Sequence, residues 1–243
     1  MIRKALEEQG VADNTIIIFT SDNGYSCGAH NFGGKVLPYE EASKSPLIIY
    51  DPRTPIKKRG IRRDAITANI DLAPTILNYA GVKPPANMDG KDLCPLIKKP
   101  KKFKRKTVPL TNMWGNDEIQ AMGVVSKDWK YIFWQYEDDR MKPTEELYHI
   151  GADRLEMTNK VTDPSAEKQL EQMRSLYDLQ LEKIKKEATK DNNYQKYAIL
   201  FDRNASAEDK RPYLVGTYEE SLKKGKTSQK LPPYHVLIDK IAG

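Results

Sequence analysis

Thr15 to Pro52 reads TIIIFTSDNGYSCGAHNFGGKVLPYEEASKSPLIIYDP, and this stretch decides the fold of the 243-residue chain. Its first part, Ile16–Phe19, is an apolar and β-branched run, which indicates a buried strand. The run ends at Ser21–Gly24, SDNG, where the glycine permits a sharp turn. Ligands bind outside the carboxyl ends of strands in open α/β sheets. The sequence therefore predicts a ligand site at Asp22 and Asn23.

The side chains of Asp22 and Asn23 carry oxygen atoms of the kind that bind hard cations such as Ca²⁺ or Mg²⁺. Calcium takes about six to eight oxygen ligands and these two side chains supply roughly two or three, so the predicted metal site is incomplete. An Asx-turn that closes the strand is the alternative interpretation, because Asp-Asn and Asn-Gly pairs favour turns. A second predicted strand, Pro46–Tyr50, follows a glycine-rich loop.

Several motifs follow the first strand in a fixed order. They are Gly28-Ala29-His30, Lys35, Tyr39-Glu40-Glu41, Pro46–Ile49, Asp71–Leu77, Ala80–Val82, Asp89–Leu93, Lys127–Ile132 and Glu145–Tyr148. This order resembles the sulfatase family of the alkaline-phosphatase superfamily, which has S-D-[NH]-G, G-x-H, a lysine, Y-E-E, P-L-I-I and D-L-x-P-T-[IL]-L in the same succession. The resemblance covers roughly residues 10–190. It implies an α/β fold and the hydrolysis of sulfate esters.

The resemblance also implies roles for individual residues. Asp22 and Asn23 would bind a divalent metal, Ca²⁺ in the first place and Mg²⁺ as the alternative. Lys35 would contact the sulfate and the leaving oxygen, where an ammonium group stabilises developing negative charge. His30 would be a second catalytic residue, although its G-A-H-N context departs from the family's frequent G-E-H-G, and a structural hydrogen bond is the alternative. The substrate would be a sulfated small molecule or polysaccharide.

The nucleophile of sulfatases is a formylglycine made from the cysteine or serine of a C-x-P-x-R or S-x-P-x-R segment. Neither cysteine of this sequence has that context, since Cys27 lies in SCGAH and Cys94 in CPLIK. We therefore expect the chain to be the C-terminal half of a sulfatase, inactive alone, with the N-terminal half as its partner. Two alternatives stay open: a phosphonate or phosphodiester hydrolase of the same superfamily, and a non-catalytic module that binds sulfated glycans.

Basic residues are concentrated in 98–106, KKPKKFKRK, where seven of nine side chains are cationic, against a net charge of +6 for the whole chain. The run is interpreted either as a contact for a sulfated polysaccharide or as a solvated loop. No nucleic-acid reader motif accompanies it. No segment approaches the ~18 apolar residues of a membrane helix, and residues 1–10 lack the apolar core of a signal peptide. The sequence predicts neither a nucleic-acid nor a membrane partner, and it leaves the compartment open.

The predicted architecture is α/β: the C-terminal part of an alkaline-phosphatase-like sheet-and-helix domain, followed by a small α+β subdomain. Residues 1–113 would form the first part, with a helix over 70–80 and a last strand at Val108–Leu110. Residues 114–189 would form the subdomain, from an antiparallel hairpin, a third short strand and a long helix that begins at Asp163-Pro164. Residues 190–243 would be an extended tail.

Overall fold

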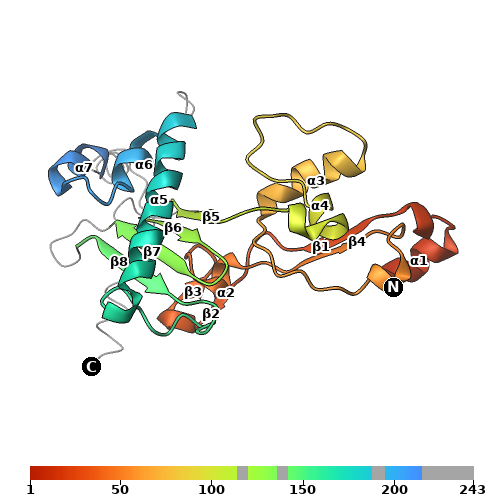
Figure 1. The fold of residues 1–243 in the computed structure, drawn as a ribbon, viewed down its shortest axis with the longest axis horizontal. Helices are drawn as coiled ribbons and strands as arrows, with labels where there is room; N and C mark the ends of the chain where they lie inside the picture. The colour runs from red at the N-terminus through yellow and green to blue at the C-terminus, as the bar shows by residue number, and fades with distance from the viewer. Residues whose placement is uncertain (114–119, 136–141, 188–194, 215–243) are drawn as a thin grey trace, which may run out of the picture.

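The computed structural model describes residues 1–113, 120–135, 142–187 and 195–214. Two regions lie side by side (Figure 1). One holds a two-stranded sheet with α1 (Ile2–Glu8), α3 (Leu72–Tyr79) and α4 (Cys94–Lys98), and the other holds a four-stranded sheet covered by a long helix. Single turns of 3₁₀ helix lie at Ala12–Asn14, Ala29–Asn31, Ile56–Lys58, Asn69–Asp71, Pro100–Lys102 and Pro164–Ala166.

The two strands predicted on either side of the glycine-rich loop, here called the motif loop (residues 21–46), are present. β1 (Ile17–Thr20) pairs with β4 (Leu47–Tyr50) in antiparallel register, so that Thr20 lies opposite Leu47. The loop between them contains the small hairpin β2 (Ser26–Cys27) and β3 (Gly33–Gly34) and the turn of helix α2 (Glu40–Ser43). The loop therefore leaves β1 and returns to the same end of the strand pair.

A glycine is required at position 24 because two backbone segments meet there. A Cβ atom on Gly24 would lie 1.9 Å from the carbonyl oxygen of Glu41, a distance at which the backbone would have to move. Gly24 N–H also donates to the carbonyl oxygen of Ala42 at 2.8 Å. The close approach fixes the SDNG turn against α2, so the start of the loop is tied to its end.

The second sheet is antiparallel, in the order β5 (Val108–Asn112), β6 (Gln120–Val125), β7 (Lys130–Gln135) and β8 (Thr144–Tyr148). The hairpin and third strand predicted from aromatic and β-branched residues are confirmed. Val108–Leu110 is a strand, but the prediction that it ends the first sheet was wrong, because it pairs with β6. The residues of β5 alternate between buried and exposed positions. A short strand of either sheet can show this pattern, so the sequence alone did not identify the strand with which β5 pairs.

Helix α5 (Glu167–Glu187) covers one face of this sheet (Figure 1). Asp163 caps the preceding turn, since its carboxylate accepts the N–H of Ser165 at 2.9 Å. The apolar stripe predicted for the helix is buried at Leu170, Met173, Tyr177 and Leu181, against β-strand residues that include Tyr131 and Phe133. The opposite face of the sheet packs against the motif loop through Tyr39, Phe32 and Leu37.

The prediction of an extended tail from residue 190 was wrong for the part of it that the structure describes. Residues 195–214 form α6 (Gln195–Leu200) and α7 (Ala207–Leu214), and Leu200 and Phe201 are fully buried in the core under α5. α6 has only six residues, and α7 has eight with Pro212 inside it, so neither carries a helical periodicity that the sequence would reveal. The remaining tail, including His235, lies outside the described residues, and the division at residues 113 and 189 stays a prediction. No described helix combines the length and the apolar content needed to cross a bilayer.

Candidate functional site

The loop that follows β1 brings together two residues that the sequence singled out. Lys35 Nζ lies 3.9 Å from Asp22 Oδ2, and their side chains are 56% and 81% exposed. The hairpin of β2 and β3 folds the chain back, which returns Lys35 to the SDNG turn. A carboxylate and an ammonium group therefore lie adjacent and open to solvent at the carboxyl end of β1.

Hydrogen bonds hold the SDNG turn in place. The side-chain amide of Asn69 donates to the carbonyl oxygens of Ser21, at 3.1 Å, and Asp22, at 2.6 Å. Ser21 Oγ donates to the carbonyl oxygen of Asn23 at 2.8 Å, and Asn23 Nδ2 donates to that of Gly24 at 2.5 Å. No local signal in the sequence predicts that Asn69 fixes the Asp22 backbone from 47 positions away.

Asp22 and Asn23 fit part of the coordination shell of a hard cation. Asp22 Oδ1 accepts the N–H of Asn23 at 3.0 Å, and the Asp22 side chain is 81% exposed. Within the described ranges, no group of three or more His, Cys, Asp or Glu side chains is placed to bind a metal ion. The two side chains match the oxygen chemistry of Ca²⁺ or Mg²⁺ but supply too few ligands for a full shell.

His30 is held by an aromatic stack. Its ring lies parallel to that of Tyr39, with 4.0 Å between centroids and 9° between planes, and it meets Tyr148 edge-on at 6.4 Å. The backbone of His30 is in the left-handed region, with φ 54°. Tyr39 in turn donates from its hydroxyl to Glu146, at 3.1 Å to the nearer oxygen. His30 is therefore oriented by the second sheet, because Tyr39 packs on Ile132, Trp134 and Tyr148.

Glu146 is a partly buried acid within this aromatic cluster. Burial raises the pKa of its carboxyl group, while hydrogen bonds from Trp134, Tyr39 and Tyr148 and the charge of His30 oppose the shift without cancelling it. The sequence identified Glu146 only as part of the Glu145–Tyr148 motif. Its contacts link the strand β8 to the ring that stacks on His30.

A buried lysine fastens the loop to the second sheet. Lys130 Nζ lies 2.7 Å from Glu156 Oε1 and 3.0 Å from Glu40 Oε1, and it donates to the carbonyl oxygen of Pro38 at 2.8 Å. Glu156 Oε2 also accepts the backbone N–H of Glu40 at 2.6 Å. Burial raises the pKa of Glu40, but Lys130 and Lys44 lower it more, so the net shift is downward. This arrangement fixes the residues on both sides of Tyr39.

The basic run 98–106 is not uniform. Arg105 forms a bidentate ion pair with Asp71, at 2.5 and 2.6 Å, and the two side chains are 6% and 0% exposed. The lysines of the run are exposed, apart from a hydrogen bond between Lys91 and the carbonyl oxygen of Lys104. Neither interpretation of the run separated Arg105 from its neighbours, and its role is to hold the segment that starts α3.

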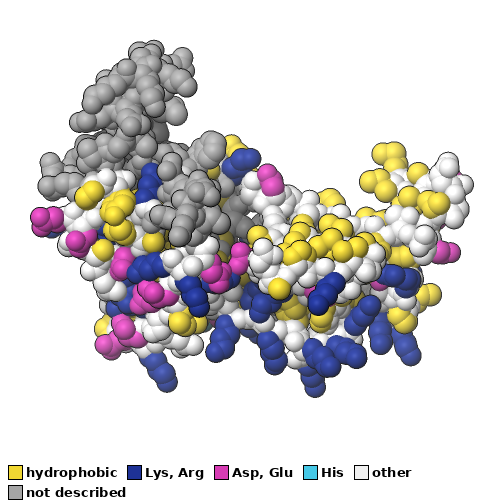
Figure 2. Space-filling model, turned by 90° about the horizontal axis from the view of Figure 1, so that it is seen from above, with side chains coloured by type: hydrophobic (Ala, Val, Ile, Leu, Met, Phe, Trp, Pro, Cys, Tyr) yellow, Lys and Arg dark blue, Asp and Glu magenta, His cyan; other side chains and the backbone are white. Residues whose placement is uncertain are grey.

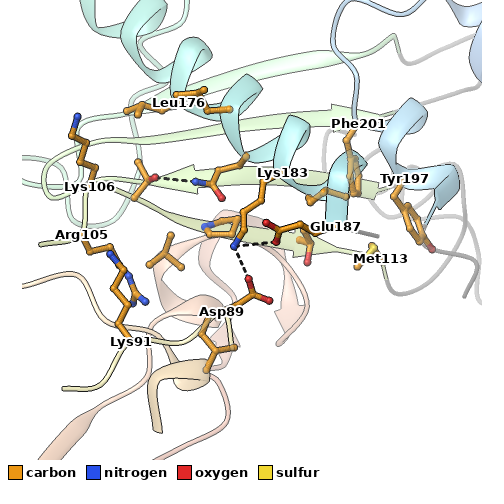
Figure 3. A pocket seen from close by; sticks show the side chains of 18 residues that line it. Asp89, Lys91, Arg105, Lys106, Met113, Leu176, Lys183, Glu187, Tyr197 and Phe201 are labelled. Carbon is orange, nitrogen blue, oxygen red and sulfur yellow. Dashed lines mark hydrogen bonds and ion pairs between the residues drawn. The ribbon is translucent and has the colours of Figure 1, made fainter. Parts of the chain in front are cut away.

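A hollow of about 720 Å³ lies between α5 and the segments around Asp89 and Arg105 (Figure 3). Lys183 reaches across it from the helix and lies 2.5 Å from Asp89 Oδ1. The wall on the helix side combines apolar side chains such as Leu176 and Phe201 with the polar Gln180 and Glu187. None of the four residues predicted for catalysis or metal binding lines this hollow, so size alone does not mark the candidate site.

A family model described as "N-sulphoglucosamine sulphohydrolase, C-terminal" matches residues 28–187. The N-acetylglucosamine-6-O-sulfatase of Bacteroides thetaiotaomicron is 31% identical over 202 residues, which is 81% of this chain and 34% of that protein. The arylsulfatase of Clostridium perfringens is 28% identical over 73% of this chain and 36% of its own length. The chain thus spans about a third of the length of these relatives.

Solved structures agree with these matches. One, described as bound to its substrate D-glucosamine-2-N,6-O-disulfate, is 29% identical with a TM-score of 0.63, over 77% of this chain and 38% of that chain. The phosphonate monoester hydrolase of Agrobacterium radiobacter is 23% identical with a TM-score of 0.62, over 74% and 38% respectively. The second likeness concerns the fold alone, which is that of alkaline-phosphatase-like enzymes.

Proposed function

Because the chain belongs to the sulfatase family, as a C-terminal region of its alkaline-phosphatase-like fold, we propose that it carries part of the active site of a sulfate ester hydrolase. The observation that carries this proposal is the 3.9 Å approach of Lys35 Nζ to Asp22 Oδ2 on the loop after β1. The Asp22 carboxylate suits a metal cation and the adjacent Lys35 ammonium group suits a sulfate anion. Such a loop at a strand end is where ligands bind in α/β folds.

Lys35 is the proposed electrostatic catalyst. Its ammonium group is exposed and its only ion pair among the described residues is the long one to Asp22, so it is free to turn toward a bound sulfate. There it would stabilise the negative charge that develops on the leaving oxygen. The hydrogen bonds from Asn69 hold the backbone of Asp22, which keeps Asp22 adjacent to Lys35 when substrate binds.

Asp22 and Asn23 are the proposed protein ligands of a divalent metal, Ca²⁺ before Mg²⁺. When bound, such a metal supplies a Lewis acid that polarises a sulfate oxygen. His30 is the proposed second catalytic residue. Its stack on Tyr39 fixes the plane of the ring, which leaves the ring nitrogens at the edge to hydrogen-bond a substrate oxygen.

We propose a sulfated sugar as substrate, a class to which the ligand of the glucosamine disulfate complex belongs. No C-x-P-x-R or S-x-P-x-R segment occurs in the 243 residues, so the proposed nucleophile, a formylglycine, would come from a partner segment that corresponds to the N-terminal region of sulfatases. The chain alone is therefore proposed to be inactive. Cys94 fits this view, because burial raises the pKa of its thiol to about 11 and disfavours the nucleophilic thiolate.

The experiment measures hydrolysis of an aryl sulfate by the purified chain and by the full-length protein that contains it. The chain alone is expected to give no turnover. In the full-length protein, Lys35→Ala is expected to lower kcat by roughly 10²–10³, the scale for loss of one preorganised group at a developing charge. Asp22→Ala should cost at least as much. The matched control is Lys101→Ala, which removes an exposed lysine of the basic run and should leave turnover unchanged.

The same assay separates the alternatives. A phosphonate monoester offered to the full-length protein tests the hydrolase alternative, which has the fold likeness in its favour and Asn23, in place of the histidine of S-D-H-G, against it. Equal activity of the Lys35→Ala and Lys101→Ala proteins would contradict the proposed site. Absence of turnover by the full-length protein on sulfate and phosphonate esters would favour a glycan-binding module.

A further inference from the structure

A second hollow, here called the arginine groove, runs between the two regions of the molecule and has a volume of about 620 Å³. One wall is the extended segment Arg62–Ile70, and the other is formed by the turn Ser126–Asp128 and by Ile150–Arg154. A groove of this volume is in the range of ~300–1,000 Å³ that holds small ligands. Both regions contribute to it, so it exists only in the folded chain.

The arginine groove reaches the candidate site. Asn69 lines the groove and is also the residue that holds the carbonyl oxygens of Ser21 and Asp22. Leu47 lines the groove and is paired with Thr20, the last residue of β1. The groove is therefore joined through Asn69 to the turn that carries Asp22. A ligand bound at Asp22 and Lys35 could extend along it.

The groove is cationic. Its lining includes five cations, Lys44, Arg62, Arg63, Lys127 and Arg154, against three carboxylates, Glu40, Asp64 and Asp128. Two cations are neutralised, since Lys44 lies 2.8 Å from Glu40 and Lys127 lies 3.5 Å from Asp64. The three arginines are exposed, and none of them forms an ion pair with a carboxylate in the described part of the chain.

This concentration of charge is local. Segments 53–63 and 98–106 hold six and seven of the 40 Lys and Arg residues and no acidic residue, so the rest of the chain has a net charge of 6 − 13, or −7. Figure 2 shows Lys and Arg side chains gathered along one margin of the face it draws. Arg62 and Arg63 differ from most of these cations because they line a concave groove rather than an open surface.

We propose that the arginine groove binds a second anionic sugar of a sulfated oligosaccharide whose neighbouring unit carries the ester at Asp22 and Lys35. Arg62, Arg63 and Arg154 would bind the sulfate or carboxylate groups of that sugar, because guanidinium groups bind such anions through two parallel hydrogen bonds. This proposal rests on the proposed function and names its substrate class: a charged glycan of at least two units, rather than a single sulfated sugar.

The test is the binding of a sulfated heparin tetrasaccharide to the purified chain, by calorimetry at fixed ionic strength. The groove variant is Arg62→Gln/Arg63→Gln/Arg154→Gln. The matched control, Lys99→Gln/Lys101→Gln/Lys102→Gln, removes the same charge from the open surface of the basic run. We expect the groove variant to lose about tenfold or more in affinity, which is at least 1.4 kcal/mol, and the control to lose much less. Circular dichroism confirms that both variants fold.

Equal losses in the two variants would overturn the proposal, because they would show attraction by net charge alone. No loss in the groove variant would also overturn it. A second measurement separates it from the proposed function: in the full-length protein, the groove variant should keep its turnover of a small aryl sulfate and lose turnover of the tetrasaccharide. Loss of both activities, or a full-length protein that binds the tetrasaccharide but hydrolyses neither, would contradict a substrate subsite.

Discussion

Phe19 on β1 and Ile48 on β4 lie directly opposite each other, and both side chains are more than half exposed, at 59% and 61%. Cross-strand apolar pairs stabilise a sheet when another layer covers them. Ile76 on α3 is also exposed, at 53%. Adjacent exposed apolar side chains mark surfaces that bind other protein. We therefore expect this face to promote association of the purified chain with other protein surfaces.

The variant Phe19→Thr/Ile48→Thr keeps β-branched residues on the strands and removes the apolar pair. We expect it to reduce concentration-dependent self-association of the purified chain, measured by light scattering after size exclusion. Its melting temperature should change little, because exposed substitutions usually alter stability by about 0.5 kcal/mol or less. The control is Ile56→Thr, an exposed isoleucine outside the strand pair. Unchanged association of the double variant would show that this face does not mediate self-association.

The sequence predicted the elements whose signal is local. β1, β4, the β6–β7 hairpin and α5 each have a run or stripe of apolar residues and a recognisable end, such as Asp163 before α5. The approach of Lys35 to Asp22 was predictable only as a family property, because a chain segment with twelve intervening residues can follow many paths. Local patterns therefore predicted the strands and helices, and the family resemblance suggested the candidate site.

Long-range polar contacts were beyond prediction from the sequence. Glu156 bonds to the backbone of Glu40 across 116 positions, and Lys130 bonds to Pro38 across 92. A lysine or glutamate in a sequence usually indicates an exposed position, since these residues are rarely buried unless paired. The partner that reverses this expectation is known only once the fold is known. The same reason explains why Arg105 was grouped with exposed lysines.

Asp71→Asn is expected to destabilise the fold strongly. It leaves the Arg105 guanidinium buried without a countercharge, and breaking a buried pair in this way typically costs about 3–5 kcal/mol. Asp51→Asn is the matched control, because Arg53 in that pair is 58% exposed and stays hydrated when its partner is lost. Urea denaturation of both variants is the measurement. If Asp71→Asn and Asp51→Asn lose similar stability, the Asp71–Arg105 pair is not the buried contact that the structure describes.

Lys130→Met is expected to loosen the candidate site through Tyr39. The substitution leaves Glu156 buried without a cation and Glu40 with Lys44 alone, which should cost about 3–5 kcal/mol. Hydrogen exchange should then speed up selectively at the amides of Glu40–Lys44, because the Lys130 contacts hold that segment on the second sheet. The amides of α5 provide the internal control. Uniform acceleration in both segments would indicate global destabilisation and not a local attachment.

Lys210 is a second buried lysine, but its hydrogen-bond partner is uncharged. We therefore expect its replacement to stabilise the fold, in contrast to that of Lys130. Nζ donates to Gln135 Oε1 at 2.8 Å and lies 4.8 Å from the centroid of the Phe133 ring. Burial lowers the pKa of Lys210 to about 8, and the charge of Asp202 opposes this only in part. Between that pH and the ordinary lysine value of 10.5, the unfolded state binds more protons than the folded state. Stability from this group therefore rises as pH increases through this window.

Lys210→Met should thus be more stable than the parent chain at pH 7, where the parent buries a charge, and the difference should shrink between pH 8 and 10. The comparison must be between the two proteins, because burial raises the pKa of Cys94 to about 11 and that thiol lowers stability as pH rises. Urea denaturation of both proteins at several pH values is the measurement, with exposed Lys57→Met as the control for loss of a surface charge. A difference that stays constant from pH 7 to 10 would mean that Lys210 titrates as an ordinary exposed lysine.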